Sequence, residues 1–262
     1  MSARRLLTAG IAAALALGLA AVLAETIPLA ERRSGFDFMS RETQAMQRDD
    51  MSNPGMLSVL EGAELWRARI GKAGKSCADC HGDAEVTMAG VAARYPGFDA
   101  AQSTAIDLAG RIEQCRATRQ DAPPLAREGR DALALTAFVA HQSRGMPITA
   151  GEDPRLAATL DEGRALYERR IGQLNLSCAN CHDENWGRKL GSAPIPQAHP
   201  TGYPIYRLEW QSLGSLQRRM RTCMIGVRAE SYIYGAPEFT ALELYLMSRA
   251  RGMSMETPGV RP

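Results

Sequence analysis

The sequence predicts an all-α protein made of two tandem copies of one domain, preceded by an N-terminal arm. Two observations carry this prediction. The segment Glu61–His81 matches the segment Glu162–His182 without a gap, at an offset of 101 residues, and roughly half of the positions are identical. Apolar residues recur at helical spacing in both copies, and no stretch shows the sustained alternation of a β-strand. Self-similarity at a fixed offset indicates a duplicated structural unit.

The composition is that of an ordinary globular protein. The chain has 262 residues, of which 45% are hydrophobic and 23% charged. These values disfavour a collagen, a coiled coil, a disordered tail and a polytopic membrane protein. The net charge of +2 and the pI near 8.2 show no basic excess of the kind that nucleic-acid binding requires. We therefore expect no nucleic-acid partner.

The first 24 residues predict a signal peptide. Arg4 and Arg5 form a basic start, an uncharged run from Leu6 to Leu23 follows, and Ala24 precedes the expected cleavage point. The run is just long enough for a membrane helix, but its terminal position and the cleavage pattern favour a signal. Cleavage would leave no stable membrane anchor and would reduce the net charge from +2 to zero. Export implies an oxidising compartment, where unpaired cysteines need a reason to stay unpaired.

The mature chain divides into three parts. Residues 25–57 are polar without a clear period, and we expect them to form an arm that lies across the first copy or a partner. Residues 58–149 form the N-terminal domain and residues 150–262 the C-terminal domain. The second copy is longer by about seven residues, and the proline-rich segment Gly191–Pro204 is the expected place of this insertion.

Each copy predicts the same order of helices. A first helix precedes a cysteine motif, a second carries an apolar face, and a last helix spans about residues 131–142 or 238–250. The face of the second helix has residues at i, i+4 and i+7, namely Leu108, Ile112 and Cys115 in the first copy and Leu216, Met220 and Cys223 in the second. Gly145 and Gly252 stand where helix ends are expected.

The cysteine motif of each copy is C-x-x-C-H, the attachment signature of c-type haem. It comprises Cys77, Cys80 and His81 in the first copy, and Cys178, Cys181 and His182 in the second. Two thiols one helical turn apart reach the two vinyl groups of a porphyrin, and the adjacent imidazole binds the iron. A redox dithiol or half of a zinc site is the alternative, which two copies in an exported helical chain disfavour. The sequence thus predicts two covalently bound haem c groups.

Cys115 and Cys223 remain, one at the same place in each copy. A disulfide between them, an inert core position and distal ligation of the haem iron are the three explanations. Their position between the haem motif and the last helix favours distal ligation. Met146 and Met253 are also duplicated, but they follow the last helix. A thiolate ligand would lower the haem potential and keep the sulfur ionised.

The surroundings of Cys115 and Cys223 differ in their arginines. Arg218, Arg219, Arg221 and Arg228 lie around Cys223 without an intervening acid, whereas acids offset the arginines near Cys115. A solvated helix face is one explanation of this cluster, and an anion pocket is the other. Arg219 precedes Cys223 by four residues and therefore shares its helix face, which makes it the best candidate for binding an oxyanion.

The two haem motifs, the extra cysteine in each copy and the segment Arg-Arg-Met-Arg-Thr-Cys223 resemble the SoxA family. This family comprises dihaem subunits of the SoxAX cytochromes, the L-cysteine S-thiosulfotransferases of bacterial sulfur oxidation. The resemblance covers essentially the whole mature chain and implies two tandem class I cytochrome c-like domains. It also implies a periplasmic enzyme that joins thiosulfate to a cysteine of the SoxYZ carrier. Electrons would pass through haem to SoxX, a monohaem cytochrome that forms a heterodimer with this chain.

The resemblance also implies roles for particular residues. His182 and Cys223 would ligate the haem of the active site, with Cys223 as the residue that handles sulfur and that occurs in the family as a persulfide. Arg219 would hold the anion. His81 and Cys115 would ligate the N-terminal haem. The alternatives are a dihaem electron carrier without catalysis and a dihaem peroxidase, because composition and spacing alone do not name thiosulfate.

Overall fold

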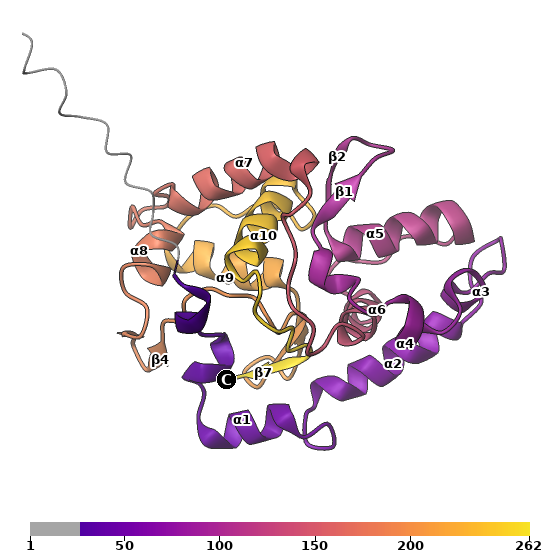
Figure 1. Cartoon of the computed structure of the whole chain (residues 1–262), viewed down its shortest axis with the longest axis horizontal. Coiled ribbons are helices and arrows are strands. Elements are labelled where there is room, and N and C mark those ends of the chain that lie inside the picture. The colour runs from indigo at the N-terminus through magenta and orange to yellow at the C-terminus, as the bar shows by residue number, and fades with distance from the viewer. Residues whose placement is uncertain (1–26) are drawn as a thin grey trace, which may run out of the picture.

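The computed structural model describes residues 27–262, so the expected signal peptide lies outside the described residues. The fold is mostly helical, with the N-terminal copy on one side and the C-terminal copy on the other (Figure 1). The arm contains η1 (Leu29–Glu31), η2 (Gly35–Phe38) and α1 (Arg41–Arg48). The N-terminal copy contains α2 (Gly55–Arg67), α3 (Cys77–His81), α4 (Ala84–Thr87), η3 (Ala92–Arg94), β1 (Gly97–Asp99), β2 (Thr104–Ile106), α5 (Leu108–Cys115), the π-helical turn η4 (Arg116–Gln120) and α6 (Arg130–His141).

The C-terminal copy repeats the four main helices in the same order and has additional strands. It contains η5 (Pro154–Leu156), α7 (Ala157–Glu168), α8 (Cys178–His182), β3 (Lys189–Leu190), β4 (Ala193–Pro194), β5 (Ile205–Arg207), β6 (Ser212–Gly214), α9 (Leu216–Gly226), α10 (Pro237–Arg249) and β7 (Gly259–Arg261). The helices expected over 131–142 and 238–250 are thus present as α6 and α10, each shifted by one residue.

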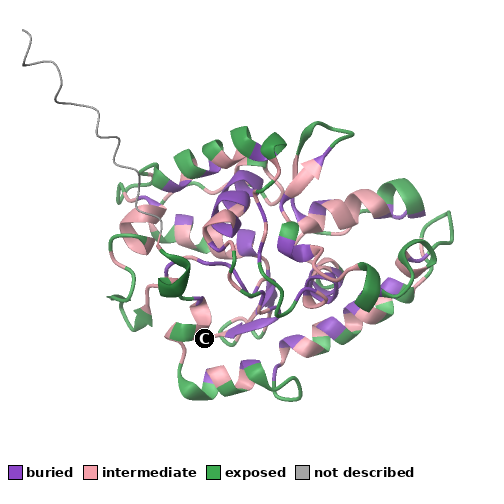
Figure 2. Ribbon diagram, in the orientation of Figure 1, coloured by how far each residue is buried: buried purple, intermediate pink, exposed green. Residues whose placement is uncertain are grey.

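A crossed pair of long helices forms the frame of each copy: α2 packs on α6, and α7 packs on α10. A glycine lies at each crossing. A Cβ atom on Gly62 would collide with the carbonyl oxygen of Ala134, and one on Gly163 would collide with that of Ala241. Gly62 and Gly163 are equivalent positions of the duplicated segment, so the same close approach of two helices is built twice. Figure 2 shows the buried residues gathered on α6 and α10.

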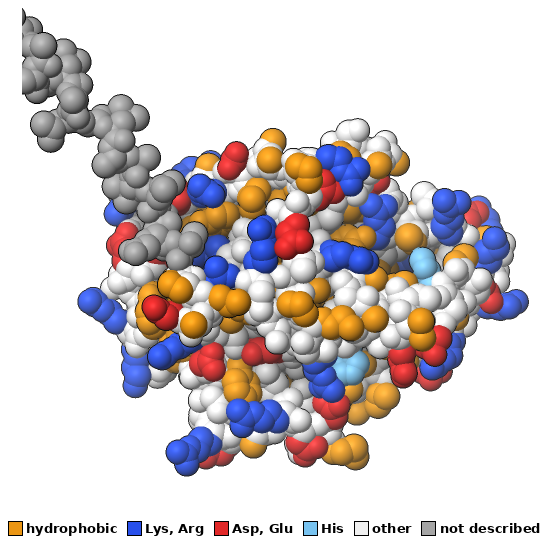
Figure 3. Space-filling view, in the orientation of Figure 1, with side chains coloured by type: hydrophobic (Ala, Val, Ile, Leu, Met, Phe, Trp, Pro, Cys, Tyr) orange, Lys and Arg blue, Asp and Glu red, His pale blue; other side chains and the backbone are white. Residues whose placement is uncertain are grey.

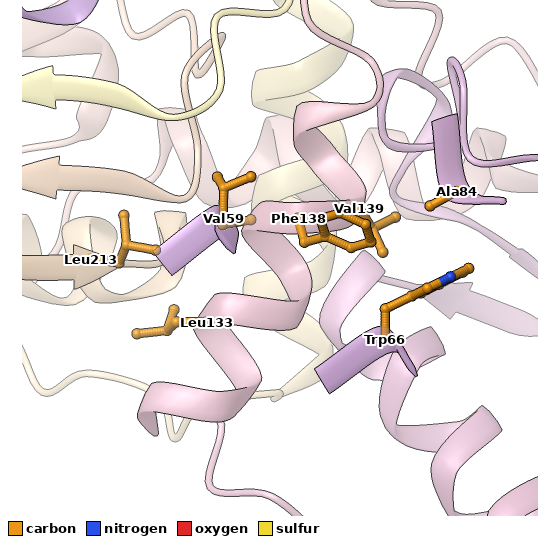
Figure 4. Packing of buried hydrophobic residues seen from close by; sticks show 8 residues of the cluster. Val59, Trp66, Ala84, Leu133, Phe138, Val139 and Leu213 are labelled. Atoms are coloured by element: carbon orange, nitrogen blue, oxygen red, sulfur yellow. The ribbon is translucent and has the colours of Figure 1, made fainter. Parts of the chain in front are cut away.

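The core of the N-terminal copy lies between its two long helices. Val59 and Trp66 of α2 pack with Phe138 of α6, and the rings of Trp66 and Phe138 are 5.8 Å apart (Figure 4). Leu213 of β6 joins this cluster from the C-terminal copy. The two copies therefore share apolar contacts and do not form two structurally independent domains.

The all-α prediction needs a correction, because residues 27–262 also contain three small sheets. β1 pairs with β2 and β3 with β4, both antiparallel, while β5 lies between antiparallel β6 and parallel β7. Each strand has only two or three residues. A strand of that length has no room for the alternating pattern by which strands are recognised in a sequence.

The duplicated segments after α6 and α10 pair with each other. Gly145 donates its N–H to the carbonyl of Met255, and Gly252 donates to that of Ile148, both at 2.9 Å. Met255 donates to Met146 and Ile148 donates to Met253, again at 2.9 Å. Each bond has its equivalent with the copies exchanged, so the two copies are related by an approximate two-fold axis here. Met146 and Met253 thus belong to the junction between the copies.

The arm lies mainly across the C-terminal copy, whereas we expected it to lie across the first copy or a partner. Gln47 accepts hydrogen bonds from the backbone of Val260 at 2.9 Å and from the side chain of Arg261. Asn53 donates to the carbonyl of Pro258 at 2.9 Å. The arm also contacts the N-terminal copy through the ion pair between Asp50 and Arg144. No pattern in the sequence indicated this pair.

No helix within residues 27–262 is long and apolar enough to cross a membrane. On the face drawn in Figure 3, acidic and basic side chains are interspersed over most of the surface. This mixture agrees with the small net charge of the chain.

Candidate functional site

The two C-x-x-C-H motifs form the short helices α3 and α8, and each is started by a serine. Ser76 accepts a hydrogen bond from the backbone N–H of Asp79 at 3.0 Å, and the Asp79 carboxylate accepts one from the backbone of Ser76 at 2.9 Å. Ser177 and Asn180 form the same reciprocal pair at 3.3 and 3.0 Å. This capping box fixes the start of the helix, so both motif cysteines lie on one helical turn with the histidine next to them.

The loop before each motif is attached to the turn after the single cysteine of the same copy. Gly71 and Gly172 both have a positive φ, of 67° and 69°, and a Cβ on either would collide with the backbone of that turn. Ala73 donates to the carbonyl of Gln120 at 3.1 Å, and Leu174 donates to that of Val227 at 3.3 Å. These bonds hold the helix of the single cysteine against the haem motif.

Each single cysteine therefore lies beside the motif of its own copy. Burial raises the pKa of Cys77, and the nearby Cys115 acts in the same direction. Burial and the nearby Cys223 raise the pKa of Cys178 to about 12. All six cysteines lie in the part of the chain that the structure describes, and all are free. The alternative of a disulfide between Cys115 and Cys223 is therefore wrong.

His182 and Cys223 face each other in the C-terminal copy. Burial by itself would raise the pKa of the Cys223 thiol. Interaction with the adjacent His182 imidazole and the positive charge of Arg219 outweigh burial, so this pKa lies below its ordinary value. Reciprocally, the charge of Cys223 raises the pKa of Arg219. The site thus brings together an imidazole, an ionisable sulfur and a guanidinium.

The orientation of His182 suits an iron ligand. Its Nδ1 lies 2.7 Å from the carbonyl oxygen of Pro196. A carbonyl can only accept, so Nδ1 carries the proton and Nε2 keeps its lone pair for a metal. With Cys178 and Cys181 on the same helical turn and Cys223 nearby, these residues fit a covalently attached haem, whose iron His182 and Cys223 would be able to ligate.

The other arginines around Cys223 make contacts elsewhere. Arg218 lies over the ring of Trp210, 4.0 Å from its centroid. Arg221 donates to the carbonyl of Tyr232 at 3.2 Å. Arg228 is near Gln173 at the protein surface. Of the four candidates, Arg219 is the one whose charge acts on Cys223.

Two site residues were missed in the sequence. Arg207 of β5 also lowers the pKa of Cys223, while burial and the charge of Arg219 lower the pKa of Arg207 itself. Pro196, which orients His182, lies in the predicted insertion. Arg207 has no counterpart in the sequence pattern around Cys223 because it lies on β5, which pairs with β6, and not on the helix of Cys223. The insertion was the available signal for Pro196, since it interrupts the duplication beside a haem motif.

In the N-terminal copy, His81 is exposed, and the ring of Trp66 lies 5.7 Å from its ring. Two of the arginines near Cys115 lie close to acids. Arg116 lies 3.7 Å from Glu113, and Arg111 lies 3.7 Å from Asp99. The N-terminal site therefore has the same cysteine and histidine pattern, but Arg111, the counterpart of Arg219, lies near an acid.

Comparisons with known proteins show the family to which the chain belongs. A family model described as SoxA/TsdA, cytochrome c domain, matches residues 61–148 and 162–255. The L-cysteine S-thiosulfotransferase subunit SoxA of Pseudaminobacter salicylatoxidans is 38% identical over 235 residues, which are 89% of this chain and 82% of the relative. The same subunit of Rhodovulum sulfidophilum is 38% identical over 231 residues, 88% of this chain and 80% of the relative. The crystal structure of SoxXA from P. pantotrophus has a TM-score of 0.85 and 33% identity, covering 88% of this chain and 87% of the solved one.

Proposed function

The chain belongs to the SoxA family of L-cysteine S-thiosulfotransferase subunits, and on this premise we propose that its C-terminal copy joins thiosulfate to a cysteine of a carrier protein. Membership of the family makes it a cytochrome c of thiosulfate oxidation. The residue assignments, the number of haems and the partners that follow are our proposal.

Two haem c groups are attached, one in each copy. Cys77 and Cys80 hold the first, and Cys178 and Cys181 hold the second. His81 and Cys115 would ligate the iron of the first haem, and His182 and Cys223 would ligate that of the second. This assignment is supported by the capped helices that present the motifs, by the free Nε2 of His182 and by the place of each single cysteine beside its own motif.

The reaction forms a sulfur–sulfur bond between the outer sulfur of thiosulfate and the thiol sulfur of the carrier cysteine. The thiol loses its proton, and two electrons leave. The haem iron, when bound, supplies an acceptor for electrons. Arg219 binds the dianion and places it against Cys223, since a guanidinium pairs with an oxyanion through two parallel hydrogen bonds. The lowered pKa of Cys223 favours the ionised form of its sulfur, which is the form that reacts.

The partners follow from the same family. The solved relative is a SoxXA assembly, which supports a monohaem SoxX as the electron-accepting partner in a heterodimer. The SoxYZ carrier provides the cysteine that is modified. The expected signal peptide supports a periplasmic place of action after cleavage. The three-part division at residues 25–57, 58–149 and 150–262 remains our proposal for the domain boundaries.

The observation that carries this proposal is the convergence of His182, Cys223 and Arg219 in one copy. We expect Cys223→Ala to abolish thiosulfate-dependent modification of the carrier cysteine, measured by intact mass with SoxX present. Both haems should remain attached, because the substitution leaves the four motif cysteines in place.

Cys115→Ala is the matched control, since it removes the equivalent sulfur of the other copy. It should alter the spectrum of the N-terminal haem and reduce turnover much less. Full activity of Cys223→Ala would refute the proposed site, and equal losses in both variants would place the chemistry elsewhere.

A further inference from the structure

The histidine of the C-terminal motif is held from two sides, and the arm supplies one of them. We propose that Gln197, fixed by the arm, is a positioning residue for His182 that lowers the reduction potential of the C-terminal haem. This inference rests on the proposed function, because it takes His182 as the iron ligand.

The arm holds the segment that orients His182. The backbone N–H of Arg33 donates to Oε1 of Gln197 at 2.7 Å, and Nε2 of Gln197 reaches the carbonyl of Glu31 at 3.4 Å. Two residues further, Nδ1 of His199 lies 2.9 Å from the carbonyl of Arg33. Gln197 is fully buried. The carbonyl of Pro196, directly before it, therefore cannot move away from His182 without breaking these contacts.

Arg249 ties the other side of His182 to the same segment. Its Nη2 lies 2.5 Å from Oδ1 of Asp183, the residue after His182, and 3.4 Å from the carbonyl of Gln197. Tyr167 donates to the same Asp183 oxygen at 2.9 Å. His182 is thus enclosed between two anchored residues, Asp183 and Pro196. We call this arrangement the bracket.

The N-terminal copy lacks this bracket. It has no insertion, so nothing corresponds to Pro196 or Gln197. Gly82 stands where the second copy has Asp183, and Gln142 stands where it has Arg249. Trp66, the counterpart of Tyr167, donates instead to the carbonyl of Gly82 at 3.1 Å. The N-terminal haem therefore serves as an internal reference for any change made to the bracket.

The chemical consequence follows from the hydrogen bond at Nδ1. A carbonyl that accepts this proton makes the other ring nitrogen of His182 a stronger donor to iron. A stronger donor stabilises the more positive, ferric state and lowers the potential. The bracket keeps the carbonyl of Pro196 in place, so loosening it should raise the potential of one haem only.

The test uses Gln197→Met in the full chain with SoxX, because methionine fills a similar volume without either hydrogen bond. Potentiometric titration and electron paramagnetic resonance follow each haem of this chain separately. We expect the potential of the C-terminal haem to rise and that of the N-terminal haem to stay constant. Asp50→Asn, which loosens the arm at its contact with Arg144 in the other copy, should shift neither.

If Gln197→Met does not fold, a second pair of variants tests the same inference. Both Arg33→Pro and Arg33→Ala remove the arginine side chain, but only the proline removes the N–H that Gln197 accepts. The preceding Arg32 has an extended ψ of 131°, which tolerates a following proline. Arg33→Pro should raise the potential of the C-terminal haem, and Arg33→Ala should leave it unchanged.

The outcomes separate this inference from the proposed function. Unchanged potentials in Gln197→Met and Arg33→Pro, with histidine–thiolate spectra retained, would overturn the positioning role alone. Equal shifts of both haems would also overturn it, since they indicate general loosening. A wild-type C-terminal haem without histidine ligation would overturn the proposed function and this inference together.

Discussion

Arg219 offers the sharpest test of how the site recognises its substrate. The charges of Cys223, Arg207 and Glu209 act on it, but none of the ion pairs within residues 27–262 includes it. A partly buried guanidinium without an acidic partner is available to bind an anion. Arg219→Ala removes this charge and leaves the α9 backbone and Cys223 in place.

The magnitude follows from the strength of a charge-assisted hydrogen bond, about 1.5–3 kcal/mol. Each 1.36 kcal/mol changes a rate constant about tenfold, so kcat/KM for thiosulfate should fall roughly 10- to 150-fold. Arg219→Lys keeps the charge but loses the planar fork, and it should recover part of the loss. Steady-state rates with the carrier and SoxX, at varied thiosulfate concentration, give these values. A higher KM with unchanged kcat would indicate binding alone.

Arg218→Ala is the matched control because Arg218 precedes Arg219 on the same helix but stacks on Trp210. It should change kcat/KM much less. The reasoning is refuted if Arg219→Ala retains full kcat/KM, or if the two alanine variants lose the same amount.

The remaining predictions concern stability. Gly163→Ala should lower the free energy of unfolding by about 1–3 kcal/mol through its collision at the helix crossing, whereas Gly226, with no neighbour within 4 Å, should tolerate alanine. Thermal unfolding of the two variants compares them. Burial and the Asp107 carboxylate raise the pKa of Glu243 well above its usual range. The folded protein therefore holds a proton that the unfolded chain releases above about pH 4.3. The contribution of Glu243 to stability therefore declines as pH rises. Glu243→Gln should remove this decline, measured in a pH series of denaturant titrations. Burial lowers the pKa of His199 to about 4. Its contribution of about 3 kcal/mol is present above pH 6.5 and is lost as pH falls toward 4, and in His199→Gln the same titrations should show a flatter profile.

The duplicated features of the fold were predictable from the sequence because local rules fix them. The cysteine motifs begin where Ser76 and Ser177 cap a helix, and the last helices end within a residue of their expected bounds. A glycine stands at the same position of both copies, as Gly62 and Gly163, because each copy needs the same close helix crossing. Repetition at one offset makes such positions visible in a single sequence.

The features that escaped prediction arise from contacts between distant segments. Nothing in residues 27–53 indicates that Gln47 meets Val260, more than 200 positions away. Arg207 reaches the site through the pairing of β5 with β6, whose strands have three residues each. The insertion was visible, but its effect on His182 depends on the single carbonyl of Pro196. A backbone acceptor carries no side-chain signature.

The differences between the copies indicate where the chemistry is confined. Duplication supplies both copies with a capped motif, a glycine turn and a cysteine beside the motif, so these shared parts can account for haem attachment but not for a reaction at one copy. The parts found in the second copy alone are Arg219 without an acidic partner, the insertion and the Arg249–Asp183 pair. All three converge on His182 and Cys223, and the arm adds its contacts at the same place. In the first copy, Arg116 and Arg111 are each near an acid. These differences favour the C-terminal copy as the place where an anionic substrate binds, which is why we propose that the sulfur–sulfur bond forms there.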